Sequence, residues 1–366
     1  MPCVSDGAMS HPVFTIVLDT YYRPAMLRQA VEALIRQSYS YLEIILINNG
    51  ATPETVDYLR EVAAQDERVK LIHFAENQYT PDDPLKMLDT CLNAGLKAAT
   101  GDYIWYQSDD DWIADDYAEK MVRLFQGNAE CITAAGLPVA VNAEGKVMEA
   151  GQRKTNLRPR YMPGHEVALD YLRGGNMFSA PGSIFTIRRD VLVKAGGFHR
   201  AFEWSQLFGI VPFGVSGFDE SAVLYWRRHE GQLNKQLTAR GWIGTKEKSS
   251  LLKDWEIERR WQVFGSDIAR EVVTGLRNQV CKTAARWFAI NLVHLRLRTS
   301  WRIMKLIWNH LRFWREILAS FPPALRNLKG EFLLQLKLSL KRLFDRCPSL
   351  ATLSPGIARL RERVNR

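Results

Sequence analysis

Three consecutive aspartates, Asp109, Asp110 and Asp111, are the residues of this 366-residue chain whose type and spacing most directly indicate chemistry. They follow Tyr103–Gln107, an apolar run of buried-strand type. Adjacent carboxylates repel one another unless a cation or several hydrogen-bond donors offset their charge. Mg²⁺ and Mn²⁺ use carboxylates together with phosphate oxygens, so the triplet suits a metal–diphosphate site. A solvated acidic loop that caps a helix over Ala114–Phe125 would have the same sequence pattern.

Polar residues also follow two earlier apolar runs. Asp19–Tyr21 comes after Val13–Leu18, and Asn48–Gly50 comes after Leu42–Ile47. Because segments with helical apolar spacing alternate with these runs, the sequence predicts an α/β fold with a doubly wound, mostly parallel sheet and helices on both faces. In such sheets ligands bind beyond the carboxyl ends of the strands. The polar residues after each run are therefore the candidate site residues.

The composition is that of an ordinary globular protein, with 46% hydrophobic and 24% charged residues. The five cysteines are scattered and form no C-x-x-C pair, which disfavours a zinc ribbon or a disulfide framework and fits a reducing compartment. The first residues do not have the pattern of a secretory signal, and no apolar stretch is long enough to span a bilayer. We therefore expect a cytoplasmic protein.

Glycine-rich phosphate-binding motifs are missing from the sequence. Neither G-x-G-x-x-G nor G-x-x-x-x-G-K-[ST] occurs, which disfavours a dinucleotide-dependent dehydrogenase. A bound nucleotide would have to be held without such a loop, and we expect a metal ion to take its place.

The net charge of +9 is unevenly distributed. Acidic residues outnumber basic ones up to residue 240, and basic residues dominate from there on. Two amphipathic segments, within Arg286–Leu318 and Leu325–Phe344, carry Trp or Leu on one side and Arg or Lys beside it. Such helices suit an anionic membrane surface. A helical subdomain that packs on the rest of the chain is the alternative, and no recognised motif supports nucleic-acid binding.

Four segments in order resemble family 2 glycosyltransferases of the GT-A fold. The first runs from Phe14 to Thr55 and contains LDTYYRPAML and ILINNG, and the second is GDYIWYQSDDDWIADDYAEKM. The third is FTIRRDVLVKAGGFHRAFEWSQLF, and the fourth is AVLYWRRHEG. The resemblance covers residues 12–235. It implies an N-terminal tail at 1–11, a catalytic domain at 12–243 with a nucleotide-binding half (12–112) and an acceptor half (113–243), and a basic helical region at 244–366.

The resemblance assigns the base-binding role to the first two turns. Asp19, Thr20 and Tyr21 fall where the family's turn contacts the nucleotide base, with Asp19 in place of the usual Pro. Asn48 and Asn49 stand in place of an acidic pair, one of which reads the uracil or thymine N–H. Asn retains an acceptor oxygen, but its hydrogen bond lacks the charge of a carboxylate. The identity of the nucleotide base in the donor therefore stays open.

The later motifs supply the remaining roles. The resemblance implies that Asp109 contacts the ribose, that Asp110 binds Mn²⁺ or Mg²⁺, and that Asp111 is an alternate metal ligand. Glu203 matches the base that deprotonates the acceptor hydroxyl. Residues of a strand that lie two apart share a face, so Arg227 and His229, rather than Arg228, are expected over the diphosphate. The alternatives are that Glu203 is an acid in a surface turn and His229 a polar residue in a loop.

The resemblance implies an inverting, metal-dependent glycosyltransferase that moves a sugar from a UDP- or dTDP-linked donor to a bacterial envelope glycan of lipopolysaccharide, O-antigen or capsule type. The expected partners are the nucleotide-sugar, a glycan or glycolipid acceptor and the inner face of the plasma membrane. One alternative is a catalytically silent nucleotide-sugar binder that scaffolds a membrane complex. Another is a nucleotidyltransferase of related topology, which is disfavoured because such enzymes normally have a glycine-rich first loop.

Overall fold

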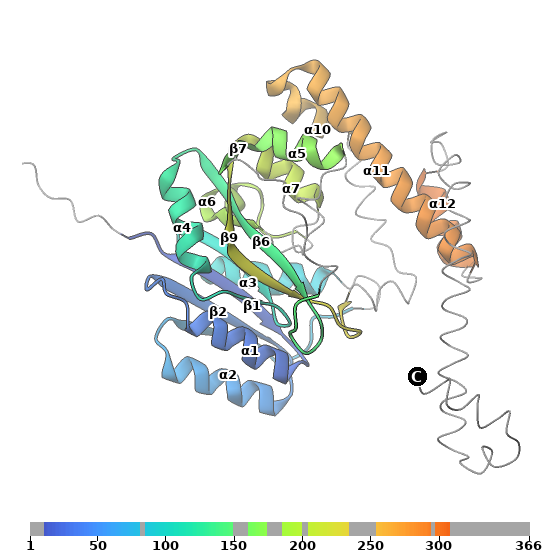
Figure 1. The fold of residues 1–366 in the computed structure, drawn as a ribbon. Helices are drawn as coiled ribbons and strands as arrows, with labels where there is room; N and C mark the ends of the chain where they lie inside the picture. The colour runs from blue at the N-terminus through green and yellow to red at the C-terminus, as the bar shows by residue number, and fades with distance from the viewer. Residues whose placement is uncertain are drawn as a thin grey trace, which may run out of the picture. The chain divides into compact units, whose positions relative to one another are not determined.

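The computed structural model describes residues 11–80, 85–148, 160–173, 185–199, 204–233, 254–293 and 297–307. The chain divides into two compact units, Met1–Glu230 and Gly231–Arg366. Figure 1 shows the sheet with its helices in the first unit and the helices labelled α10, α11 and α12 in the second. The predicted boundary of the catalytic domain at residue 243 lies outside the described residues, so it stays a prediction.

Within the described residues of the first unit, nine strands form one sheet in the order β3-β2-β1-β4-β8-β6-β9-β5, and β7 pairs with β9. The strands are β1 (Phe14–Thr20), β2 (Leu42–Asn49), β3 (Val69–Phe74), β4 (Tyr103–Ser108), β5 (Trp112–Ile113), β6 (Cys131–Val141), β7 (Tyr161–Pro163), β8 (Phe185–Arg188) and β9 (Val215–Arg227). Strands β3, β2, β1 and β4 are parallel, as are β6 and β9. The other pairings are antiparallel, so the predicted α/β sheet is confirmed as a mixed, mostly parallel one.

The helices lie on both faces of this sheet (Figure 1). They are α1 (Pro24–Ile35), α2 (Pro53–Gln65), α3 (Lys86–Ala98), α4 (Tyr117–Gly127), α5 (Gly164–Leu172), α6 (Arg189–Lys194), α7 (Trp204–Ile210) and the 3₁₀ helix η3 (Val211–Phe213). Apolar residues of α1, α2 and α4 join one core cluster, and those of α3, α5, α6 and α7 join another. Pro24 and Pro53 occupy the first position of their helices, where the missing N–H costs no hydrogen bond.

The side chains of the central strands alternate between the two clusters. In β1, Ile16 and Leu18 belong to the cluster of α1, whereas Val17 belongs to the cluster of α3. Both β1 and β2 are buried along their whole length, which explains their continuous apolar runs. By this alternation Asp19 lies on the face of Val17, which is the face that α3 covers.

A buried carboxylate stabilises the opposite, amino-terminal edge of the parallel strands. Glu43 of β2 accepts hydrogen bonds from Thr15 Oγ1 (2.6 Å), from Lys70 Nζ (2.5 Å) and from the backbone N–H and hydroxyl of Thr100 (both 2.8 Å). Burial by itself would raise the pKa of Glu43, but the hydrogen bonds from Lys70, Thr15 and Thr100 outweigh it and lower the pKa to about 2. This network ties β1, β2 and β3 to the segment before β4.

The second unit contains α10 (Asp254–Trp261), the 3₁₀ helix η4 (Gln262–Phe264), α11 (Ser266–Val293) and α12 (Leu297–Ile307). Helix α12 packs on α11 through Ile303 and Met304, which join Ala284 and Ala285 in a small core. Leu297 and Trp301 of α12 are 62% and 54% exposed. None of the helices among the described residues is both long and apolar enough to cross a bilayer. The predicted segment 325–344 lies outside the described residues.

Candidate active site

The candidate site lies where the strand order reverses. From β1 the chain proceeds to β2 and β3 on one side of β1 and then crosses through α3 to β4 on the other side. Such a reversal leaves a crevice between the two neighbouring strand ends, here those of β1 and β4. Asp19 pairs in register with Ser108, and Thr20 with Asn48. Asp19, Thr20, Asn48 and Asn49 are therefore the last residues of their strands, whereas the aspartate triplet follows β4.

The three aspartates after β4 are buried. Asp109, Asp110 and Asp111 are 5%, 7% and 3% exposed. Helix α4 begins at Tyr117, and the residue at its N-cap position is Asp116. The interpretation of the triplet as a solvated, helix-capping loop is therefore wrong.

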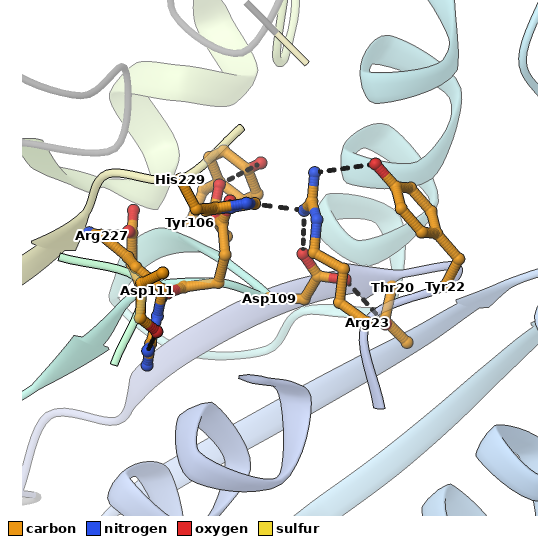
Figure 2. Close-up of polar contacts among 11 residues, drawn as sticks. Thr20, Tyr22, Arg23, Tyr106, Asp109, Asp111, Arg227 and His229 are labelled. Atoms are coloured by element: carbon orange, nitrogen blue, oxygen red, sulfur yellow. Dashed lines mark hydrogen bonds and ion pairs between the residues drawn. The ribbon is translucent and has the colours of Figure 1, made fainter. Parts of the chain in front are cut away.

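Both carboxylate oxygens of Asp109 are bound by residues at the end of β1. Oδ2 accepts a hydrogen bond from Thr20 Oγ1 at 2.9 Å, and Oδ1 accepts one from Arg23 Nη1 at 2.5 Å (Figure 2). The guanidinium of Arg23 also lies over the ring of Tyr22, 5.0 Å from its centroid. Asp109 thus joins the two strand ends that border the crevice.

Asp110 meets a residue that follows the far end of β9. Its Oδ2 lies 2.9 Å from Nε2 of His229 and 3.4 Å from Nη1 of Arg23. Figure 2 shows His229 and Arg23 approaching the acidic loop from opposite sides. The side chains of Asp110 and His229 are both more than nine-tenths buried. The sequence predicted that these two residues belong to one site, and the structure brings them into contact.

Arg227 holds the acidic loop in place. Its backbone N–H donates to Asp111 Oδ1 at 2.9 Å, and its Nε donates to the backbone carbonyl of Asp110 at 2.9 Å. The rest of the guanidinium donates to Ala143 O at 2.6 Å and to Gln29 Oε1, and it lies over the ring of Trp112. Arg228 is exposed and stacks on Trp226 instead. These contacts of Arg227 are with the protein, so its expected role over a diphosphate stays a prediction.

Burial of several acids raises their pKa values. Burial and the neighbouring Asp109 raise the pKa of Asp19 to about 7. Burial and Asp110 raise the pKa of Asp111 well above its usual range, and burial raises that of Asp109 even though Arg23 opposes the shift. Burial is the largest cause of each shift, and the neighbouring carboxylates of the cluster add to it.

These side chains fit a divalent ion that takes some of its ligands from the protein and the others from a phosphate. Asp110 and His229 supply a carboxylate oxygen and an imidazole nitrogen side by side. Among the described residues no group of three or more His, Cys, Asp or Glu side chains is arranged to hold an ion alone. Mg²⁺ is commonly bound through one or two carboxylates plus substrate phosphates, which matches what these side chains offer.

The two asparagines at the end of β2 bond to their own chain. Asn48 Oδ1 accepts from the N–H of Ala51 at 2.8 Å, and its Nδ2 lies 2.5 Å from Nδ1 of His73. Asn49 Oδ1 accepts from the N–H of Gln78 at 2.8 Å, while its buried Nδ2 has no hydrogen-bond partner among the described residues. The acceptor oxygens that were expected to read a base are therefore engaged by backbone N–H groups.

The remaining candidates divide into exposed and undescribed residues. Tyr21, directly after β1, is 42% exposed, and its ring meets that of Tyr22 edge-on with 5.5 Å between centroids. Glu203, the expected base, lies outside the described residues, immediately before α7.

Sequence reasoning missed Arg23, Gln29 and Trp112. Arg23 lies in the turn that the sequence did single out, between Tyr22 and the helix-initiating Pro24. Its position after the first strand was a usable signal, because the residues there border the crevice. Gln29 lies inside α1 and carried no local signal.

Comparison with known proteins identifies a family. The family model described as glycosyl transferase family 2 matches residues 15–196. An uncharacterized glycosyltransferase of Haemophilus influenzae is 32% identical over 120 residues, which are 33% of this chain and 45% of that protein. The putative glycosyltransferase EpsH of Bacillus subtilis is 30% identical over 147 residues, 40% of each chain. The matched region thus spans less than half of the length of these curated relatives.

Solved structures share the fold at low sequence identity. TarS 1-349 of S. aureus in complex with UDP-GlcNAc has a TM-score of 0.56 and 11% identity, covering 87% of this chain and 92% of that one. The mannosyltransferase PcManGT of Pyrobaculum calidifontis, in complex with GDP-Man and Mn²⁺, has a TM-score of 0.50 and 14% identity, covering 87% and 88%. At such identities the likeness shows a GT-A fold and nothing further.

Proposed function

The chain belongs to glycosyltransferase family 2 through residues 15–196, and from that premise we propose that it is an inverting, metal-dependent transferase. Its donor would be a nucleoside-diphosphate-sugar, UDP- or dTDP-linked, and its acceptor a hydroxyl of a lipid-linked bacterial envelope glycan of lipopolysaccharide, O-antigen or capsule type. The observation that carries the proposal is the buried acidic loop at the β1–β4 crevice, where Asp110 meets His229 and Arg23.

The donor would lie across the ends of β1 and β4. In this proposal the base lies near Tyr21 and the ends of β1 and β2, the ribose contacts Asp109, and the diphosphate faces Asp110 and His229. Thr20 and Arg23 already bond to Asp109 and so hold its carboxylate toward the crevice. A Mn²⁺ or Mg²⁺ ion held by Asp110 and His229, with Asp111 as the alternate ligand, would supply electrophilic stabilisation of the leaving group.

Relatives and structural neighbours support a donor of this class without defining it. TarS and PcManGT have been solved with UDP-GlcNAc and with GDP-Man and Mn²⁺, respectively. Because the oxygens of Asn48 and Asn49 each accept a backbone N–H, base recognition by these residues would use the second lone pair of an oxygen or require a rearrangement of the turn. The base is therefore the feature that a donor screen has to determine.

The transfer would be a single displacement at the anomeric carbon. Glu203 accepts the proton of the acceptor hydroxyl as its oxygen forms a bond to that carbon. The bond from the carbon to the phosphate oxygen breaks on the opposite face, and the nucleoside diphosphate leaves with the electron pair. Arg23 is positioned to offset the charge that develops on the leaving group. Arg227 acts indirectly in this scheme, because it fixes the backbone of Asp110 and the carboxylate of Asp111.

The proposed membrane partner rests on the second unit. Leu297 and Trp301 are one helical turn apart on α12, both are more than half exposed, and Arg298 beside them is exposed as well. An apolar pair next to basic side chains suits the headgroup region of an anionic bilayer. We propose that this face contacts the inner surface of the plasma membrane, which would bring the enzyme to a lipid-linked acceptor.

A donor screen tests the proposed function. The full chain is incubated with UDP-, dTDP-, GDP-, ADP- and CMP-sugars and Mn²⁺ or Mg²⁺, and the released nucleotide is measured. We expect release from a UDP- or dTDP-sugar that stops with a chelator and in Asp110→Asn. The matched control is Asp115→Asn, because Asp115 is exposed and lies outside the crevice.

The other outcomes separate the alternatives. One outcome is that a nucleotide-sugar raises the Tm of the protein while no nucleotide is released, even when membrane extracts that contain acceptors are added. That result would favour the catalytically silent binder. Formation of inorganic diphosphate from a sugar phosphate and a nucleoside triphosphate would favour a nucleotidyltransferase. Release that persists in Asp110→Asn would contradict the assignment of the acidic loop.

A further inference from the structure

Arg23 lies where a cation would be expected in the acidic loop. Its Nη1 is 2.5 Å from Asp109 Oδ1 and 3.4 Å from Asp110 Oδ2, and its side chain is only 16% exposed. Asp110 Oδ2 is also the atom that lies 2.9 Å from His229. The carboxylate oxygen to which the proposed function assigns the metal ion is thus already in contact with two protein groups.

The charge on Arg23 is permanent. Asp109 and Asp110 raise the pKa of its guanidinium further, although burial opposes them, so no accessible pH removes the charge. Like charges at such short range repel strongly in a buried site, where water screens them poorly. An ion that binds Asp110 while Arg23 stays in place would therefore bind weakly.

The diphosphate of a donor changes this balance. Its oxygens supply the ligands that the protein does not offer to an ion by itself. The same oxygens give the guanidinium a new anionic partner, and Arg binds phosphate groups well through its planar set of donors. Arg23 could then exchange Asp110 for the diphosphate without losing a charged partner.

We propose that Arg23 is the resident counter-ion of the acidic loop and a coupling residue between metal and donor. It keeps free divalent ions out of the empty site, and it releases Asp110 when the diphosphate arrives. The proposal rests on the proposed function, since it assumes a metal–diphosphate donor. Its consequence is a reciprocal linkage, in which metal and nucleoside diphosphate each strengthen the binding of the other.

Binding of Mn²⁺ to the nucleotide-free protein tests this directly. Free Mn²⁺ is measured by electron paramagnetic resonance during titration of wild type, Arg23→Gln, Arg23→Lys and Arg28→Gln. Arg23→Gln should bind Mn²⁺ at least about tenfold more tightly than wild type, because the competing charge is gone. Arg23→Lys keeps a positive charge and should stay near wild type. Arg28 stacks on Tyr58 on the exposed side of α1, so Arg28→Gln is the matched control.

Two further measurements make the result decisive. Adding Asp110→Asn to Arg23→Gln should abolish the gain, which places the bound Mn²⁺ at Asp110. Melting curves of the wild-type protein need no substitution: Mn²⁺ alone should leave Tm unchanged, whereas Mn²⁺ with UDP or dTDP should raise it. Unchanged or weaker Mn²⁺ binding in Arg23→Gln, or a rise in wild-type Tm with Mn²⁺ alone as large as with nucleotide, overturns the proposal. If the donor screen fails while Arg23→Gln still gains Mn²⁺ affinity, the proposed function fails and the counter-ion role stands.

Discussion

Asp110 Oδ2 and His229 Nε2 lie 2.9 Å apart although 119 residues separate them in the chain. The first follows β4, which pairs with β1, and the second follows β9, which runs parallel to β6 on the other side of β8. The contact therefore forms only when these distant strands are assembled into one sheet. In a glycosyltransferase of this kind it would link the donor site to the half that is expected to hold the acceptor.

Replacement of His229 tests how much this contact contributes to metal binding and to donor turnover. His229→Gln should lower the affinity for Mn²⁺ in the presence of the nucleotide and the rate of donor turnover by about 10- to 100-fold, as is usual when a metal site loses a group of this kind. Titration with Mn²⁺ at saturating nucleotide measures the affinity. His11→Gln is the control, since His11 is exposed and stacks on Tyr41 at the other edge of the sheet. Full Mn²⁺ affinity in His229→Gln would show that Asp110 does not need the imidazole.

Arg227 is predicted to matter for stability as well as for activity. Arg227→Lys cannot reach the carbonyls of Asp110 and Ala143 and the amide of Gln29 together, so buried acceptors lose their donors. The free energy of unfolding should fall by about 1–3 kcal/mol. Urea denaturation measures it, with the exposed Arg228→Lys as the control. Equal loss in both variants would indicate that the network around Arg227 contributes nothing specific.

The lowered pKa of Glu43 predicts that the folded protein loses stability in acid. Its pKa is about 2 in the folded protein and near 4.5 when unfolded, so the unfolded state binds more protons between these values. The stabilisation is therefore fully present above about pH 4.5 and is lost as the pH falls toward 2; the shift corresponds to at most about 3 kcal/mol. Unfolding of Glu43→Gln, measured by urea at pH 3 and pH 7, should show a smaller difference between the two pH values than wild type. The same difference in both proteins would contradict the prediction.

The first strands of the sheet could be predicted from the sequence because their signals are local. Continuous apolar runs predicted β1 and β2, and the run Tyr103–Gln107 coincides with β4. The strand ends were placed too early. Asp19 and Asn49 were expected after the strands, but backbone pairing with β4 and β3 extends to them. The polarity of a residue therefore does not show where a strand ends when the strand ends at a crevice.

The contacts of the site could not be predicted because they depend on long-range packing. The position of Arg23 after β1 indicates that it borders the crevice, but not that it meets Asp109. Nothing near Gln29 in the sequence indicates that it meets Arg227. The apolar stripe expected in the second unit shows the same limit. Ile303 and Met304, which lie within the predicted segment Arg286–Leu318, pack on α11, whereas Trp301 of the same segment is 54% exposed.

The exposed pair on α12 predicts how the full chain binds membranes. The double variant Leu297→Gln, Trp301→Gln should bind anionic vesicles at least about tenfold more weakly than wild type, because two apolar side chains no longer enter the bilayer. Sedimentation with vesicles of phosphatidylglycerol and phosphatidylethanolamine measures binding. Val263→Gln is the control, since Val263 is an exposed apolar residue of the same unit outside α12. Unaltered sedimentation of the double variant would mean that α12 is not the contact.

Replacement of Glu203 should affect the rate of sugar transfer but not the binding of the donor. If its carboxylate accepts the acceptor proton, Glu203→Gln should reduce kcat for transfer on the order of a thousandfold, because the amide cannot act as a base. Glu203→Asp should retain more of the rate. The KM for the donor should change little in both, since the donor contacts lie at the β1–β4 crevice.

The comparison that decides the role of Glu203 is between these two variants and Glu130→Gln, an exposed acid before β6. A base gives an ordered series in which Glu203→Gln is far slower than Glu203→Asp and Glu130→Gln matches wild type. An acid in a surface turn gives no such series, and all three variants would keep the wild-type rate. Loss of donor affinity together with kcat in Glu203→Gln would indicate instead that this residue shapes the donor pocket, and another group would then have to take the proton.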